Sequence, residues 1–232
     1  MHRGDEKKQA ILNVAERLFY LKGYEQTSVQ DILDVLKASK GSFYHHFESK
    51  YAVLDTLCVQ RAEQALIQAE EAMGRETDSL IRLNLLLHYA LPIRQGEEQF
   101  LSLLLPMAFS HGGESLYTRY ADALSEAFSP RLKEVLTRAR EEKIIYLYYP
   151  RQTEDMLLAL LNRCWRSIAG HIMGLCFTSG ALEPAALMEI LQAYRFAMER
   201  VLDAPYGSLE LVRLPELAEP AQRVLAELRL KR

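Results

Sequence analysis

One segment of the chain gathers a high density of hydrogen-bonding side chains: Ser39-Lys-Gly-Ser-Phe-Tyr-His-His-Phe-Glu-Ser-Lys50. Hydroxyl and ammonium groups donate hydrogen bonds to phosphate oxygens, and phenol and imidazole groups reach either phosphates or the edges of bases. The chemistry that this combination indicates is the binding of duplex DNA.

Two phenylalanines set the orientation of this segment. Phe43 and Phe47 stand four residues apart, which places them on one face of a helix, and we expect that face to point into the core. Tyr44, His45 and His46 then face outward, where three neighbouring aromatic side chains are unusual on an otherwise polar helix. For His46 the alternative, that it tucks under the following long helix, stays open.

Two lysines, Lys40 and Lys50, fall at predicted helix N-termini. The helix dipole disfavours a cation there by about 0.3–1 kcal/mol, whereas a bound phosphate reverses this balance. We expect them to clamp the DNA backbone on either side of the segment; the alternative is two solvated lysines. Ser39 caps a helix, contacts DNA, or does both, and Gly41 serves either close approach to DNA or packing. The predicted DNA-binding residues are Thr27, Ser28, Ser39, Lys40, Gly41, Ser42, Tyr44, His45, His46 and Lys50.

Helices must hold this segment in place. An apolar stripe over residues 11–19 predicts a first helix, which Gly23 ends. A second, capped helix follows over residues 29–36, and after a turn another short helix covers residues 40–46. This is the layout of a helix-turn-helix, in which the last helix lies in the major groove.

The rest of the chain is also helical in its periodicity, and no strand-like alternation persists. We therefore predict an all-α fold. Residues 1–50 form a three-helix, helix-turn-helix DNA-binding domain, and residues 51–74 form a long connecting helix. Residues 75–204 form a larger helical domain for ligand binding and dimerisation, and residues 205–232 form a C-terminal tail with a possible extra helix.

Composition narrows the class of function. The 232 residues are 49% apolar and carry a net charge of −3, so any affinity for DNA must come from a local surface. Cys58, Cys164 and Cys176 are widely spaced, and we expect buried, reduced thiols. Without a Gly-rich phosphate loop, metal-ligand spacing or an acid–base pair, we expect no enzyme activity, no metal and no cofactor. The polar N-terminus and the short apolar runs predict a cytoplasmic protein without a membrane partner.

Residues 10–57 resemble the TetR family of one-component transcriptional regulators, over about a fifth of the chain. This resemblance implies an all-helical homodimer that binds DNA through its N-terminal domain and usually encloses a ligand cavity in its C-terminal domain. Members usually carry a small residue in the turn where this chain has Lys37. The matching features are Ala15-Glu-Arg-Leu-Phe19, Gly23-Tyr24, Thr27-Ser28-Val29, Ile32 and the run from Lys40 to Lys50.

Two long apolar segments, 153–177 and 183–202, exceed what one protomer covers easily, which favours an isologous dimer built from them. A purely intramolecular core is the alternative. The predicted interface residues are Arg166, Ala169, Gly170, Met173, Gly174, Leu187, Ile190, Leu191 and Tyr194.

Aromatic and basic residues of the C-terminal domain would suit an apolar pocket with a few polar groups. Among them, Trp165 with Arg163 and Arg166 best fits an anionic or aromatic effector. The alternatives are ordinary core aromatics, and arginines that form interface salt bridges. The predicted ligand-binding residues are His88, Tyr89, Phe100, Met107, His111, Tyr117, Tyr120, Arg163 and Trp165.

Together these features predict a sequence-specific, dimeric transcriptional regulator. In this hypothesis a repressor binds a palindromic double-stranded DNA operator and is released from it by an unknown small-molecule effector. The alternative is a regulator of the same fold that is controlled by a partner protein, for which the C-terminal tail is the only support.

Overall fold

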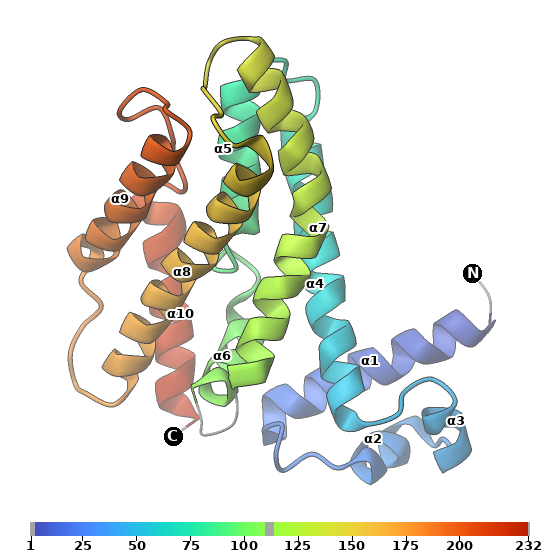
Figure 1. Ribbon diagram of the computed structural model, residues 1–232. Coiled ribbons are helices and arrows are strands. Elements are labelled where there is room, and N and C mark those ends of the chain that lie inside the picture. Colours follow the sequence, from blue (N-terminus) through green and yellow to red (C-terminus); the bar gives the residue numbers. More distant parts are fainter. Residues whose placement is uncertain (1–2, 110–113, 232) are drawn as a thin grey trace.

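The computed structural model describes residues 3–109 and 114–231, and over these ranges it contains ten α-helices and no strand (Figure 1). The all-α prediction is confirmed for this part of the chain. Three helices at the N-terminal end form a small head, and six helices further along the chain form a larger core. One helix, α4, runs between the two.

The head consists of α1 (Arg3–Lys22), α2 (Val29–Leu36) and α3 (Lys40–Tyr44). Its interior is apolar, with Leu12, Phe19, Ile32 and Phe43 fully buried. Helices as short as α2 and α3 are marginal on their own in water, so their ends need support. Serine hydroxyls at positions 28, 39 and 49 provide it by accepting hydrogen bonds from backbone N–H groups at the starts of α2, α3 and α4.

The helix α4 (Lys50–Met73) leaves the head and enters the core, where it packs against α5 (Ser79–Ala90) and α7 (Glu114–Glu141). It is followed by Gly74, whose φ is +43°. A residue with a Cβ atom would be strained in this conformation. Figure 1 shows α4 and α7 running alongside each other for much of their length. The same helix therefore belongs to both parts of the molecule.

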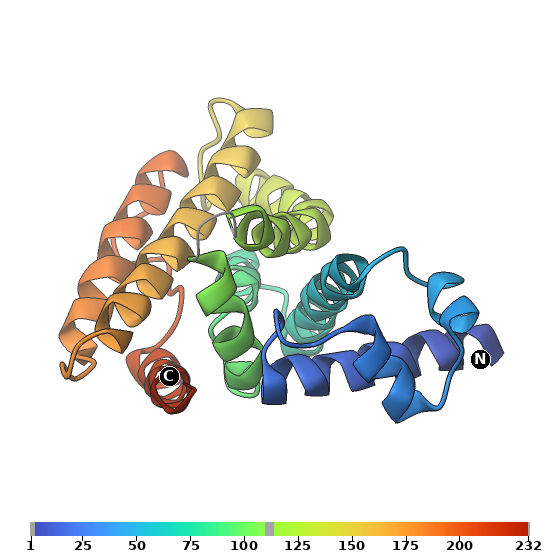
Figure 2. The ribbon, with the colours of Figure 1, turned by 90° about the horizontal axis from the view of Figure 1, so that it is seen from below.

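The core is completed by α6 (Glu98–Ala108), α8 (Pro150–Cys176), α9 (Pro184–Val201) and α10 (Leu214–Leu230). The helices α8 and α9 pack against each other, and α10 packs against α6, α8 and α9. Figure 2 shows α8 and α9 on the side of the molecule opposite to the head.

The segment after residue 204 is an integral part of the core. The possible extra helix predicted for it exists as α10, and the apolar side of α10 is buried from Leu217 to Leu228. The connection between α9 and α10 is fixed by the buried carboxylate of Glu199, whose Oε1 accepts hydrogen bonds from the backbone N–H groups of Gly207 (3.0 Å) and Leu209 (3.1 Å).

Candidate nucleic-acid interface

The helix α2 begins with a capping box and ends with a left-handed residue. The Ser28 hydroxyl accepts a hydrogen bond from the N–H of Asp31 (3.1 Å), and the Asp31 carboxylate accepts one from the N–H of Ser28 (2.7 Å). At the other end of α2, Lys37 has a φ of +50°, and the N–H of Ala38 donates to the carbonyl of Leu33 (3.1 Å). This hydrogen bond closes a Schellman motif, which directs the chain into α3.

Two buried rings orient α3, as predicted. Phe43 and Phe47 lie in the interior of the head with their ring centroids 6.0 Å apart. Tyr44 consequently points outward and is 55% exposed. His45 is also exposed, whereas His46 is half-buried and its ring centroid lies 4.9 Å from that of His45. In Figure 1, α3 lies at the edge of the head that faces away from the core.

Most of the predicted DNA-binding residues are at least partly exposed on the head. Gly41 is exposed, and a Cβ atom there would meet only the hydroxyl of Ser39, at 4.0 Å. Packing within the chain therefore does not require a glycine at this position. The exposed members of the set are Ser28, Ser39, Lys40, Gly41, Tyr44 and His45, and the half-buried members are Ser42, His46 and Lys50.

The prediction for Thr27 needs correction. Its side chain is 1% exposed, and its hydroxyl donates hydrogen bonds to the carbonyls of Gly23 (2.8 Å) and Leu18 (3.3 Å). These bonds tie the start of α2 to the end of α1, so the hydroxyl has a structural role inside the head.

The two lysines of the predicted clamp differ in their surroundings. Lys40 is exposed, whereas the Lys50 ammonium donates to the carbonyl of Tyr24 (2.6 Å) and lies 4.1 Å from the centroid of the Tyr24 ring. Burial lowers the pKa of Lys50, an effect that the nearby charge of Glu25 opposes. An ammonium has three donors, so Lys50 can still donate to a phosphate, but from a fixed position.

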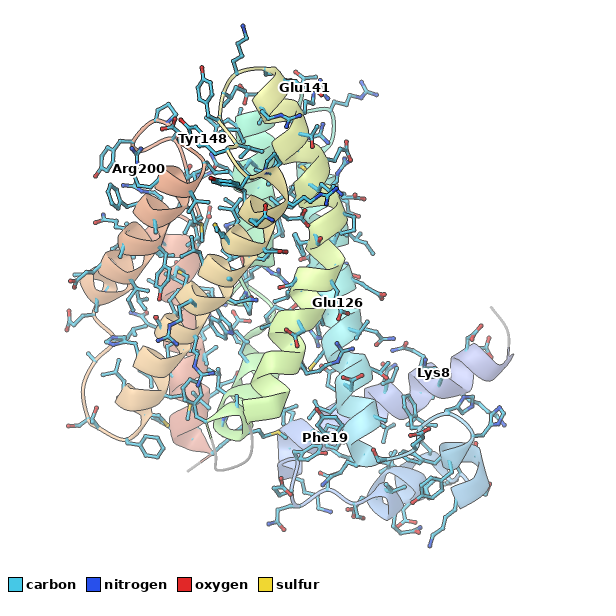
Figure 3. All side chains as sticks on the ribbon, viewed as in Figure 1. Lys8, Phe19, Glu126, Glu141, Tyr148 and Arg200 are labelled. Carbon is cyan, nitrogen blue, oxygen red and sulfur yellow. The ribbon has the colours of Figure 1, made fainter. Side chains whose placement is uncertain are left out.

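Besides the continuous helix α4, side-chain contacts attach the head to the core. The Arg61 guanidinium, on α4, bridges Glu16 of α1 (2.5 Å) and Glu97 at the start of α6 (3.1 Å). It also stacks over the ring of Phe100, 5.2 Å from its centroid. Figure 3 shows Phe19 where α1 meets the rest of the molecule, whereas Lys8 lies further out on α1. A change in the core can therefore reach the orientation of α1 through side-chain contacts.

The predicted ligand-binding residues do not form one site. His88 and Tyr89 line a cavity of about 570 Å³. This cavity lies between the C-terminal ends of α4 and α5 and the N-terminal half of α10. Met107 lines a second cavity of about 570 Å³ at the junction of head and core. Phe100 and Tyr120 pack against each other with ring centroids 5.3 Å apart, and burial raises the pKa of Tyr120 well above its usual range.

The effector site predicted around Trp165 is wrong. Trp165 is buried in the core, whereas Arg163 is exposed, so the two side chains do not face one cavity. Two other members of the predicted set, His111 and the side chain of Tyr117, lie outside the described residues.

The predicted dimer surface also needs correction. Ala169, Met173, Leu187 and Leu191 are buried within the chain's own core. The reason is α10, which covers the inner side of the α8–α9 pair and takes the place that the prediction gave to a partner. Gly170 faces inward as well, because a Cβ atom there would lie 3.8 Å from the Phe109 ring. Of the remaining members, Arg166, Ile190 and Tyr194 are half-buried and Gly174 is exposed.

The sequence-based prediction of the dimer surface did not include two exposed apolar side chains of α8 and α9. Met156 on α8 and Phe196 on α9 are each 49% exposed. Met156 stands four residues before Leu160, which is half-buried. This spacing marks a second apolar stripe on α8, beside the one that runs through Leu157 and Leu161, and could have identified the outer face.

Two negative findings apply to residues 3–109 and 114–231. No helix there is long and apolar enough to cross a membrane. The same residues contain no group of three or more His, Cys, Asp or Glu side chains that could hold a metal ion.

Comparison with known proteins agrees with this geometry. A helix-turn-helix head on a helical core defines a class of DNA-binding regulators. Residues 11–57 match the model of the bacterial regulatory proteins of the tetR family.

Individual relatives match over part of the chain. The chain is 35% identical over 82 residues to the transcriptional regulator EthR of Mycolicibacterium smegmatis, a match that covers 34% of this chain and 38% of EthR. The chain therefore spans well under half of this curated relative, and only 19% of the length of the regulator YerO of Bacillus subtilis.

Solved structures share the fold over most of the chain. A crystal structure of a tetR-family transcriptional regulator from Pectobacterium atrosepticum superposes with a TM-score of 0.59 at 17% identity, covering 88% of this chain and all of that one. A transcriptional regulator from Saccharomonospora viridis, in complex with choline, superposes with a TM-score of 0.52 at 18% identity, covering 81% of this chain and 94% of that one.

Proposed function

We propose that this protein is a DNA-binding transcriptional regulator, and that α3 is the helix that enters the major groove. The observation that carries the proposal is the two-sided character of α3, with Phe43 buried and Tyr44 exposed beside Lys40. Exposed phenol, imidazole and ammonium groups suit phosphates and base edges. The set contains no arginine that would read guanine, so we expect specificity to depend partly on the shape of the DNA.

We further propose that the regulator is a homodimer joined through the outer face of the α8–α9 pair. Exposed Met156 and Phe196, with half-buried Leu160 and Ile190 between polar neighbours, offer an apolar surface for a second copy. A two-fold axis there would pair each face with itself and present two heads to one duplex. The expected operator is a palindrome whose half-sites lie about 34–36 Å apart.

A small-molecule effector is the proposed control, and repression the proposed mode. Two cavities of about 570 Å³ have volumes suited to small ligands, and the regulator from Saccharomonospora viridis is described in complex with choline. The alternative, control by a partner protein through a free C-terminal tail, loses its support because α10 is packed into the core.

Selection of bound duplexes from a random pool tests the proposal. The wild-type protein is expected to enrich a palindrome, which then serves as the probe for variants. Tyr44→Ala should abolish binding to this probe while leaving the thermal transition and the dimer mass unchanged. Tyr148→Ala is the matched control, because Tyr148 is also exposed but lies at the far end of the molecule (Figure 3). Unaltered affinity of Tyr44→Ala would show that the DNA-facing surface is assigned wrongly.

A second measurement separates phosphate contacts from base contacts. Lys40→Ala should weaken all duplexes about equally and should reduce the slope of log K against log salt by about one unit. A loss confined to one sequence would contradict the phosphate role. Lys50→Ala should have the same effect on affinity and salt slope, and it should also remove the hydrogen bond that Lys50 donates to the carbonyl of Tyr24.

A further inference from the structure

The cavity at the junction of head and core is built from four parts of the chain that are far apart in sequence. Its walls come from residues 19–26 at the end of α1 and the turn after it, and from the C-terminal ends of α6, α8 and α10. Its volume of about 570 Å³ lies within the range of small-molecule sites. Figures 1 and 2 both show the ends of α1, α6 and α10 converging here.

The walls of this cavity are mainly apolar. Leu103, Met173 and Leu228 line it from three different helices and are buried. At its edges, apolar side chains remain in contact with solvent: Leu21 is 67% exposed, and Phe177 is 64% exposed. A ligand that covers these groups removes apolar surface from water, which favours binding.

One end of the cavity is polar and carries the ammonium of Lys231, and Glu25 lines the cavity on the head side. The Lys231 ammonium donates to the Ser102 hydroxyl (2.9 Å) and lies 3.8 Å from the centroid of the Tyr20 ring. The nearby Glu227 carboxylate already accepts hydrogen bonds from Ser102 (2.9 Å) and Tyr20 (3.3 Å). On the head side, Lys22 also lines the cavity and pairs with Asp31 (2.7 Å). An anionic group placed beside Lys231 would gain charge-assisted hydrogen bonds.

The cavity lined by His88 and Tyr89 has the same volume as the junction cavity but differs from it in chemical character. Glu71, Glu216 and Glu219 line it together with Arg94 and Arg223, so five charged side chains face it, against three in the junction cavity. It offers no continuous apolar wall to a hydrocarbon chain. The two cavities are therefore distinguished by their chemistry and not by their size.

We propose that the junction cavity binds an amphipathic monocarboxylate. The hydrocarbon part lies along Leu103, Met107, Met173 and Leu228, and the carboxylate lies beside the ammonium of Lys231. This inference names the class of effector for the proposed regulator, and only its regulatory part rests on that proposed function.

The position of the site couples its occupancy to the head. Tyr20 of α1 contacts Glu227 of α10 and, through its ring, Lys231 directly after α10; Tyr20 and Lys231 line the cavity. A carboxylate that engages Lys231 competes with the second of these contacts, and the hydrocarbon part lies between head and core. Because the ligand contacts both parts, it favours one orientation of the head over another.

Calorimetric titration of the full-length protein with dodecanoate, below its micellar concentration, tests the site without DNA. The expected result is saturable binding of one molecule per chain. Dodecanol and the Lys231→Met variant remove the carboxylate and the ammonium respectively, and each should weaken binding by about tenfold or more. Equal affinity for dodecanoate and dodecanol would overturn the proposed orientation.

Filling the cavity provides the matched comparison. Cys176→Trp and Met107→Trp place an indole in the junction cavity and should abolish binding, and the second variant serves if the first does not fold. Ala72→Trp fills the other cavity of equal volume and should leave binding unchanged. Binding that is unsaturable, or that survives both junction variants, would overturn the inference.

DNA release is measured separately with the selected operator. Dodecanoate should weaken wild-type binding to DNA by at least about tenfold and leave Lys231→Met binding unchanged. If no operator is bound at all while the calorimetric pattern holds, the proposed function fails and the ligand site stands. If the operator is bound and dodecanoate occupies the junction cavity without changing DNA affinity, the regulatory part of the inference is refuted.

Discussion

Replacing Lys37 by glycine should stabilise the protein. Lys37 occupies the left-handed region, with φ +50° and ψ +41°, in the Schellman motif that ends α2. This conformation is unfavourable by about 1–2 kcal/mol for a residue with a Cβ atom, and it carries no such cost for glycine. Glycine loses about 0.5–1 kcal/mol more conformational entropy on folding. The difference predicts that Lys37→Gly raises the free energy of unfolding by about 0.5–1 kcal/mol.

Thermal and urea unfolding followed by circular dichroism measure this effect. For a chain of this size the gain corresponds to a rise in Tm of about 1–4 °C. Lys37→Ala is the control, because alanine keeps the Cβ atom and removes the charge. The salt concentration should be high enough to screen the favourable interaction of a lysine with the C-terminal end of a helix. If Lys37→Ala stabilises the protein as much as Lys37→Gly does, the backbone explanation is refuted and the charge is responsible.

Two further predictions concern ionisable groups. The hydrogen bond from Lys22, followed by those from Ser28, lowers the pKa of Asp31. The ionised carboxylate therefore stabilises the fold at pH values above its unfolded pKa of about 3.9, and this stabilisation is lost as the pH falls toward its folded pKa. Unfolding measured from neutral to acidic pH should show Asp31→Asn less stable than wild type near pH 7, with the difference shrinking toward pH 2; a constant difference would contradict the assignment. Burial raises the pKa of Cys58 and that of Cys164 to about 12, so neither thiol of a Cys176→Ser variant should react with Ellman's reagent near pH 8 until denaturant is added. Rapid reaction of the native variant would indicate an opening of the core.

The head was predictable from the sequence because its signals are local. Capping serines and the spacing of Phe43 and Phe47 determine the short helices and the exposure of Tyr44, and all of these lie within a few residues of one another. Thr27 was misassigned because a hydroxyl that caps or contacts DNA and one that donates to a buried carbonyl look the same in a sequence.

The core was less predictable because helical periodicity identifies an apolar face but not the element that covers it. Leu187 and Leu191 were assigned to a partner protomer, whereas α10 of the same chain packs against that side of the α8–α9 pair. The pairing of Trp165 with Arg163 failed for a related reason. Residues two apart on a helix point to different sides, so their closeness in sequence does not bring their side chains together.

The length of α4 has a mechanical consequence for recognition. With 24 residues it extends for about 36 Å, and its N-terminal end carries the head. If its far end stays fixed in the core, a tilt of about 5° displaces the head by about 3 Å, the length of one hydrogen bond. The helix thus acts as a lever arm: a rearrangement of the core too small to disturb its packing would be enough to separate Tyr44 and its neighbours from the bases that we propose they contact.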